Sequence, residues 1–184
     1  MKEKFKLTPL EKSWILYDIA NSAFVLLAAT LIPIFFNAVA GSAGLSETQY
    51  LSYWGYAGSI STLLVAFIGP VCGALTDQRG LKKPIFLITS LLGAVGCAML
   101  GFAWSWLAFL AIFVIAKVGF SSSIVFYDSM LPEITTTERM DKISSVGYAF
   151  GYIGSVIPFA VCLVLVLMHD AIGITQSTAM TVAF

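Results

Sequence analysis

The sequence has little charge. Lys and Arg together number 10, Asp and Glu number 10, and the net charge at neutral pH is zero. Charged residues make up 11% of the chain, against about 25% in a typical soluble domain. With 59% hydrophobic residues, the chain cannot build a water-exposed surface, so we expect it to be solvated mostly by membrane lipid. The balanced charge gives no excess of Lys and Arg for nucleic acid, and we expect no such partner.

Cysteine and histidine are also scarce, which leaves few ligands for a metal. The three cysteines, Cys72, Cys97 and Cys162, lie inside apolar stretches, and no two form a C-x-x-C pair. We interpret them as small packing residues. The sequence contains no H-E-x-x-H, no G-x-S-x-G and no phosphate-binding glycine loop. We therefore expect no metal, no organic cofactor and no enzyme activity.

Long apolar runs are what the sequence does contain. A helix needs about 20 mostly apolar residues to cross the hydrocarbon core of a membrane. Five runs are long enough and a sixth is incomplete: Trp14–Val39, Tyr53–Thr76, Pro84–Ala103, Trp106–Tyr127, Ser145–Met168 and 177–184. The sequence thus predicts an all-α membrane protein, with a cytoplasmic segment at 1–13 and a helix bundle at 14–184. Because the last run is too short to span, we expect a fragment of a longer protein.

The first run could alternatively be a secretory signal, because lysines precede it and Ala38-Val39-Ala40 resembles a cleavage site. A signal core has about 7–15 apolar residues. This run is longer, and it contains Asp18 and Asn21, which a removable leader does not need. We interpret it as a retained span.

The basic residues alternate between the two sides of the predicted bundle. All but Lys117 lie before the first run, between the second and third, or between the fourth and fifth. These residues are Lys2, Lys4, Lys6, Lys12, Arg79, Lys82, Lys83, Arg139 and Lys142. The positive-inside rule then predicts a cytoplasmic N-terminus in a multi-pass membrane protein. We expect the membrane to be a bacterial plasma membrane. We also expect the longest polar connection, Ser129–Ser144, on the cytoplasmic side.

Several polar residues stand within the apolar runs. A charged side chain at the centre of a membrane helix costs about 2.5–3.5 kcal/mol on insertion scales, so it needs a reason to be there. Lys117, Ser121 and Asp128 share one helix face, and Asp18 and Asn21 share another. Two such stripes predict a shared aqueous cavity in which the lysine would suit proton or anion handling. Structural alternatives remain: an ion pair or snorkelling for Lys117, anchoring at the headgroups for Asp18, and a place at the interface for Asp128.

The run at Ser145–Met168 carries a pattern for close packing. Gly147, Gly151 and Gly154 lie on one face, and small residues at this spacing let two membrane helices approach closely. Pro158 follows and is expected to kink the helix. The pattern predicts tight packing without specifying a function.

The polar connection between the second and third runs reads Gly73-x-Leu75-x-Asp77-x-x-Gly80-x-Lys82-Lys83. It resembles the signature loop between helices 2 and 3 of the major facilitator superfamily (MFS), except that Gln78 replaces the usual basic residue. Pro132-Glu133 and Arg139 resemble the junction of helices 4 and 5, whose charges contact that loop. The resemblance implies a cytoplasmic gate that combines the two segments: Gly73, Asp77, Arg79, Gly80, Glu133 and Arg139.

Finer motifs resemble the UMF1 branch, which includes vacuolar amino-acid effluxers of the autophagy-related type. They are Trp14-x-x-Tyr17-Asp18-x-x-Asn21-Ser22, Phe126-Tyr127-Asp128-x-x-Leu131-Pro132-Glu133 and Gly147-x-x-x-Gly151-Tyr152-x-Gly154-Ser155. The resemblance implies the N-terminal six-helix half of a transporter, with its sixth helix truncated and a C-terminal half as partner.

For function, the same resemblance implies a secondary transporter that works by alternating access on a small polar solute. Amino-acid efflux is the first expectation. A sugar or lipid-like solute, or a non-transporting scaffold or inactive fragment, remains the alternative. Lys117 stands where many family members carry an arginine, and Asp18, Asn21, Lys117 and Ser121 are the residues expected to contact solute or ion.

Overall fold

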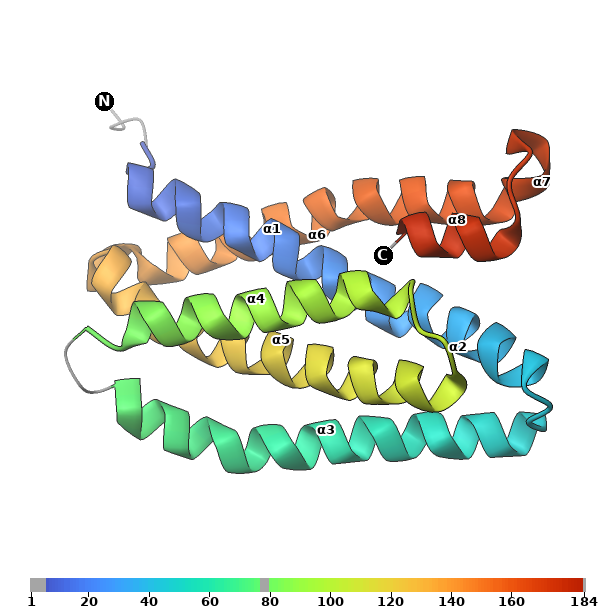
Figure 1. The fold of residues 1–184 in the computed structure, drawn as a ribbon. Coiled ribbons are helices and arrows are strands. Elements are labelled where there is room, and N and C mark those ends of the chain that lie inside the picture. Colours follow the sequence, from blue (N-terminus) through green and yellow to red (C-terminus); the bar gives the residue numbers. More distant parts are fainter. Residues whose placement is uncertain (1–5, 77–79, 184) are drawn as a thin grey trace.

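The computed structural model describes residues 6–76 and 80–183, and within these ranges the regular structure is helical (Figure 1). The helices are α1 (Pro9–Ala29), α2 (Leu31–Ser42), α3 (Glu47–Thr76), α4 (Lys82–Leu100), α5 (Trp106–Ile134), α6 (Thr137–Leu167), α7 (His169–Ile172) and α8 (Gln176–Ala183). Five spans are long and apolar enough to cross a membrane, with α1 and α2 together forming the first. The predicted all-α membrane bundle is confirmed. Helix α8 has only 8 residues, so the sixth span stays a prediction.

The first helix begins at Pro9, before the predicted start at Trp14, because Thr8 and Glu11 cap it. The Glu11 amide donates to the Thr8 hydroxyl at 3.2 Å, and the Thr8 amide donates to the Glu11 carboxylate at 2.8 Å. This reciprocal pair is a capping box. Pro9 fits the first helical position because it has no N–H to leave unpaired.

The predicted single helix at 14–39 is wrong, because the span is broken at Thr30. That residue has φ −127° and ψ −71°, outside the helical region. Its amide donates to Leu27 at 3.3 Å, and its hydroxyl donates to the carbonyl of Leu26. Pro33 lies in the first turn of α2 and has no N–H, so the helical hydrogen bond to the carbonyl four residues earlier, that of Ala29, is not available.

The predicted polar connection at Ser129–Ser144 is also wrong. Helix α5 continues to Ile134 and α6 starts at Thr137, which leaves only two residues between them. Thr136 is extended and precedes the first turn of α6, where Glu138 lies; an acidic residue there is favoured by the helix dipole. The polar residues of this region therefore lie on α5 and α6, because both helices extend beyond their apolar runs.

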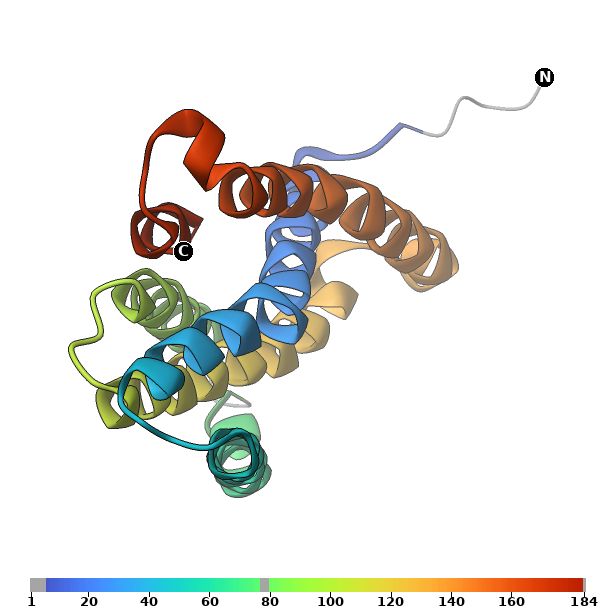
Figure 2. The ribbon, with the colours of Figure 1, turned by 90° about the vertical axis from the view of Figure 1, so that its right-hand side faces the viewer.

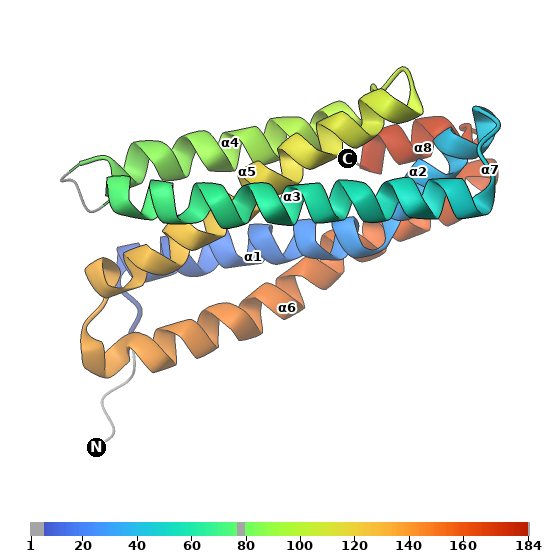
Figure 3. The ribbon, with the colours of Figure 1, turned by 90° about the horizontal axis from the view of Figure 1, so that it is seen from below.

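Small residues set the packing of the bundle. A Cβ atom added at Gly96 of α4 would lie 2.7 Å from the Ala116 Cβ of α5, and one at Gly119 would lie 2.8 Å from the Gly93 amide. Helices α4 and α5 are thus in backbone contact. Figure 2 shows α5 between α4 and α3, and α6 lying across α1 on the other side. Seen from below in Figure 3, α3 runs along the outside of the bundle.

Two apolar clusters lie at opposite ends of the bundle. One includes Phe36 and Phe109, both fully buried, and joins α2 to the start of α5. The other includes Trp14 and Tyr127, which stack with ring centroids 4.4 Å apart. The second cluster lies at the end where the N-terminus, the start of α4 and the α5–α6 junction meet (Figure 1). A candidate site lies between the two clusters.

Candidate functional site

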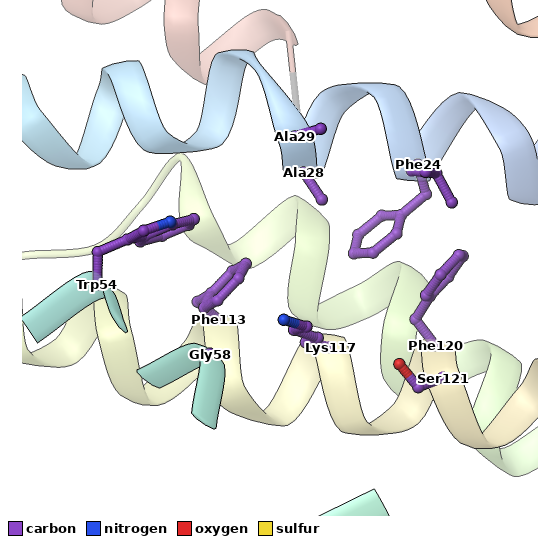
Figure 4. A pocket seen from close by; sticks show the side chains of 10 residues that line it. Phe24, Ala28, Ala29, Trp54, Gly58, Phe113, Lys117, Phe120 and Ser121 are labelled. Atoms are coloured by element: carbon purple, nitrogen blue, oxygen red, sulfur yellow. The ribbon is translucent and has the colours of Figure 1, made fainter. Parts of the chain in front are cut away.

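A cavity of about 300 Å³ opens between α1, α3 and α5, around Lys117 (Figure 4). It is lined by Phe24, Val25, Ala28, Ala29, Trp54, Gly58, Phe113, Lys117, Phe120 and Ser121. The ammonium nitrogen of Lys117 lies 5.8 Å from the centroid of the Phe113 ring. Gly58 leaves room for it: a Cβ atom there would be 3.8 Å from the same nitrogen. We call this space the Lys117 cavity.

Lys117 forms no ion pair with any residue in 6–76 or 80–183. Its only described charge interaction is the contact with the Phe113 ring, which is weaker than a paired carboxylate. A lysine in the middle of a membrane helix without a carboxylate partner is costly. The structure therefore does not support the alternative of a structural ion pair within the described residues.

Four of the ten residues that line the cavity are aromatic. Phe24 and Phe120 have centroids 4.1 Å apart, and Trp54 and Phe113 have centroids 4.3 Å apart. Figure 4 places Phe24 and Phe120 on one side of Lys117, and Trp54 and Phe113 on the other. One cation, one hydroxyl and four rings are suited to a small molecule with an anionic group and an apolar body.

The structure brings Lys117 and Ser121 together, but it places Asp18 and Asn21 elsewhere. Asp18 faces α6: a Cβ atom at Gly147 would lie 3.1 Å from one of its carboxylate oxygens. Asn21 lines a separate cavity of about 260 Å³ between α1, α4 and α5. The part of α1 that reaches Lys117 begins with Phe24 and Val25. Asp128 is exposed near the end of α5 and does not line the Lys117 cavity.

The glycines of α6 face α1. Added Cβ atoms would lie 2.7 Å from Trp14 at Gly147, 2.7 Å from the Ser22 hydroxyl at Gly151 and 2.5 Å from Ile19 at Gly154. These contacts hold the Asp18 face of α1 against α6. Pro158 lies within α6, which continues to Leu167.

Two ion pairs lie at the end of the bundle that carries the basic residues. Lys82 pairs with Glu133 and also donates to the Ser129 carbonyl at 3.3 Å, which joins the start of α4 to the end of α5. Gly73 is part of α3, and Gly80 adopts a left-handed turn with φ 89° that favours glycine. Asp77 and Arg79 lie outside the described residues.

Arg139 pairs with Glu11, a residue that the sequence analysis did not select. Glu11 is 1% exposed and accepts from the Arg139 Nε at 3.0 Å and Nη2 at 2.8 Å. The hydroxyl of Thr135 donates to the same carboxylate at 2.7 Å. We call these residues the Glu11–Arg139 clasp. The Thr8-x-x-Glu11 spacing was a visible signal for the cap, but nothing in the spacing indicated Arg139 as the partner.

Trp14 and Tyr127 have a structural role that the sequence motifs did not reveal. The Trp14 indole donates to the Tyr127 carbonyl at 3.4 Å, and the Tyr127 hydroxyl donates to the Trp14 carbonyl at 3.1 Å. This reciprocal pair fixes α1 against α5. It therefore positions the part of α1 that lines the Lys117 cavity, about three to four turns further along the helix.

Comparison with known proteins identifies a family and a relative. A family model described as "Vacuole effluxer Atg22 like" matches residues 10–140. The chain is 38% identical over 184 residues to the uncharacterized MFS-type transporter YxiO of Bacillus subtilis (strain 168). That alignment covers 97% of this chain and 43% of the relative, so the chain spans less than half of the relative's length. No solved structure matches.

Proposed function

The chain belongs to the Atg22-like family of vacuole effluxers, within the MFS-type transporters, and from this membership we propose that it is part of a secondary transporter that exports an amino acid. The family consists of transporters and not of enzymes. The transport mechanism would be alternating access, in which two helical halves rock around a central site. The described helices would form one half, and the other half would be its partner.

The single observation that supports a transport site is Lys117. It is a cation in the middle of a membrane helix, in a cavity, with no ion-pair partner among the described residues. A solute carboxylate would supply the missing partner. Hydrogen bonds between ionised groups are shorter and stronger than neutral ones, so Lys117 would hold the carboxylate of an amino acid, with Ser121 as a second donor.

The ion pairs at the basic end support a role in gating. Lys82–Glu133 links α4 to α5, and α5 carries Lys117. We propose that this pair belongs to a cytoplasmic gate with Asp77 and Arg79, and that it stabilises one of two states of the transporter. A solute could then shift the equilibrium by binding one state more tightly.

The test is transport by the full-length protein in proteoliposomes, with a panel of labelled amino acids and sugars. We expect Lys117→Ala to lower the uptake of the accepted amino acid by about tenfold or more, since a charged hydrogen bond contributes about 1.5–3 kcal/mol. Lys117→Arg should retain part of the uptake. Lys12→Ala, a lysine exposed far from the cavity, is the matched control and should transport normally.

Two results would contradict this proposal. Undiminished amino-acid uptake by Lys117→Ala would remove Lys117 from the transport site. Uptake of a sugar and of no amino acid would favour the alternative substrate class, for which the four aromatic rings of the cavity would be the binding surface.

A further inference from the structure

We propose that the broken end of α1 forms a backbone subsite in the Lys117 cavity that binds the ammonium group of the solute. This inference rests on the proposed transport function. It adds a second charged contact, made by backbone carbonyls, to the one made by Lys117.

The last turn of α1 forms part of the cavity wall. Val25, Ala28 and Ala29 line the cavity, and α1 ends at Ala29. Figure 4 shows Ala28 and Ala29 across the cavity from Lys117, which projects from α5. The last carbonyls of a helix have no intrahelical donors, and they carry a partial negative charge of about half an electron. Carbonyls at the end of α1 would then give the wall opposite Lys117 a partial negative charge.

Pro33 removes one hydrogen-bond donor from this helix end. In an unbroken helix, the amide at position 33 would bond to the Ala29 carbonyl, but proline has no amide hydrogen. Thr30 turns its amide to Leu27 and its hydroxyl to Leu26, so its described bonds satisfy the preceding carbonyls and leave Ala29 aside. In other membrane transporters, the ends of interrupted helices near the midplane bind charged parts of the solute.

The composition of the cavity explains why carbonyls would be needed. No Asp or Glu is among the residues that line it. An amino acid placed there would have its carboxylate near Lys117 and its ammonium group without a carboxylate side chain as partner. The carbonyl end of α1 can accept hydrogen bonds from that ammonium group. The apolar side chain of the solute would then contact rings such as Phe24 and Phe120.

The experiment compares three molecules with the same ring and complementary charges. Phenylalanine has both groups, 3-phenylpropionate lacks the ammonium group, and 2-phenylethylamine lacks the carboxylate. Each competes for uptake of a labelled amino acid by the full-length protein in proteoliposomes. We expect phenylalanine to compete about tenfold better than either analogue, because each analogue leaves one side of the cavity unpaired.

The variant Pro33→Ala tests the helix end itself. It supplies an amide hydrogen for the Ala29 carbonyl, so we expect phenylalanine and 3-phenylpropionate to compete within about twofold of each other. Pro158→Ala is the matched control, because Pro158 lies inside α6 and does not line the cavity. It should keep the tenfold preference.

The outcomes separate the two proposals. If labelled amino acids are transported but 3-phenylpropionate competes as well as phenylalanine, or if Pro33→Ala keeps the full preference, the ammonium subsite is wrong and the transport function stands. If no amino acid is transported or competes, the proposed function itself fails. The comparison of the three molecules in the unmodified protein does not depend on the folding of any variant.

Discussion

At the scale of single residues, the Glu11–Arg139 clasp connects the start of α1 to the start of α6. Glu11 is almost fully buried, whereas the side chain of Arg139 is 33% exposed. Removing the arginine leaves a buried carboxylate with fewer donors, so we expect Arg139→Ala to lower the free energy of unfolding by about 2–3 kcal/mol. The measurement is denaturant or thermal unfolding of the purified protein in detergent.

Substitution of the other partner, Glu11, should lower the free energy of unfolding by less. Glu11→Gln keeps an acceptor for Thr135 and leaves Arg139 with access to water, so its effect should be smaller than that of Arg139→Ala. In the double variant Glu11→Gln/Arg139→Ala, the buried charge is gone, and part of the loss should be recovered. Strict additivity of the two changes would mean that the two side chains do not interact.

At the scale of helices, glycine contacts decide how closely α4 and α5 approach. The atoms nearest to an added Cβ at Gly119 include the Gly93 amide nitrogen at 2.8 Å and the Thr89 carbonyl oxygen at 3.0 Å. Backbone cannot rotate away as a side chain can, so we expect Gly119→Ala to lower the unfolding temperature, with a free-energy cost of about 1–3 kcal/mol. Thermal unfolding in detergent measures it.

Gly55 of α3 provides the matched control. It is exposed, and an added Cβ atom would meet no heavy atom within 4 Å. Because alanine favours helix over glycine by about 0.8–1 kcal/mol, Gly55→Ala should leave stability unchanged or raise it slightly. Equal destabilisation by both variants would contradict the packing explanation for Gly119.

The helices could be located from the sequence, but their ends and their rotation could not. Apolar length predicted all five long spans, because crossing a membrane requires it. Apolar length does not indicate where a helix ends, because polar residues such as Glu11 and Glu133 can continue the helix beyond the apolar run. The break at Thr30 had a local signal in Pro33, but proline in a membrane helix often leaves the helix intact.

The same limit applies to the site. Lys117 and Ser121 share a cavity because they lie on one face of one helix, which spacing predicts. Which residues of α1 face them depends on how α1 is rotated about its axis. The α6 glycines and the Trp14–Tyr127 pair set that rotation, and it turns Asp18 toward Gly147. These contacts join residues more than 100 positions apart, and no local pattern indicates them.

At the scale of the whole molecule, the described basic residues outside Lys117 gather at one end of the bundle. Lys12, Lys82 and Arg139 lie on helices that begin at this end, where the N-terminus also lies (Figure 1). The connections at the opposite end, 43–46, 101–105 and 168–175, contain neither Lys nor Arg. Positive residues near short loops are retained in the cytoplasm. This distribution therefore predicts that the end of the bundle with the N-terminus faces the cytoplasm.

Single cysteines at the two ends test that orientation. In a background without Cys72, Cys97 and Cys162, we expect Ala43→Cys to react with a membrane-impermeant maleimide in intact bacterial cells. Thr137→Cys should react only after the cells are permeabilised. Both positions are exposed and lie at or beside a helix end, so a difference in labelling would report the side of the membrane and not burial. Labelling of Thr137→Cys alone in intact cells would invert the bundle and place the Lys82–Glu133 pair outside, where it could not act as a cytoplasmic gate.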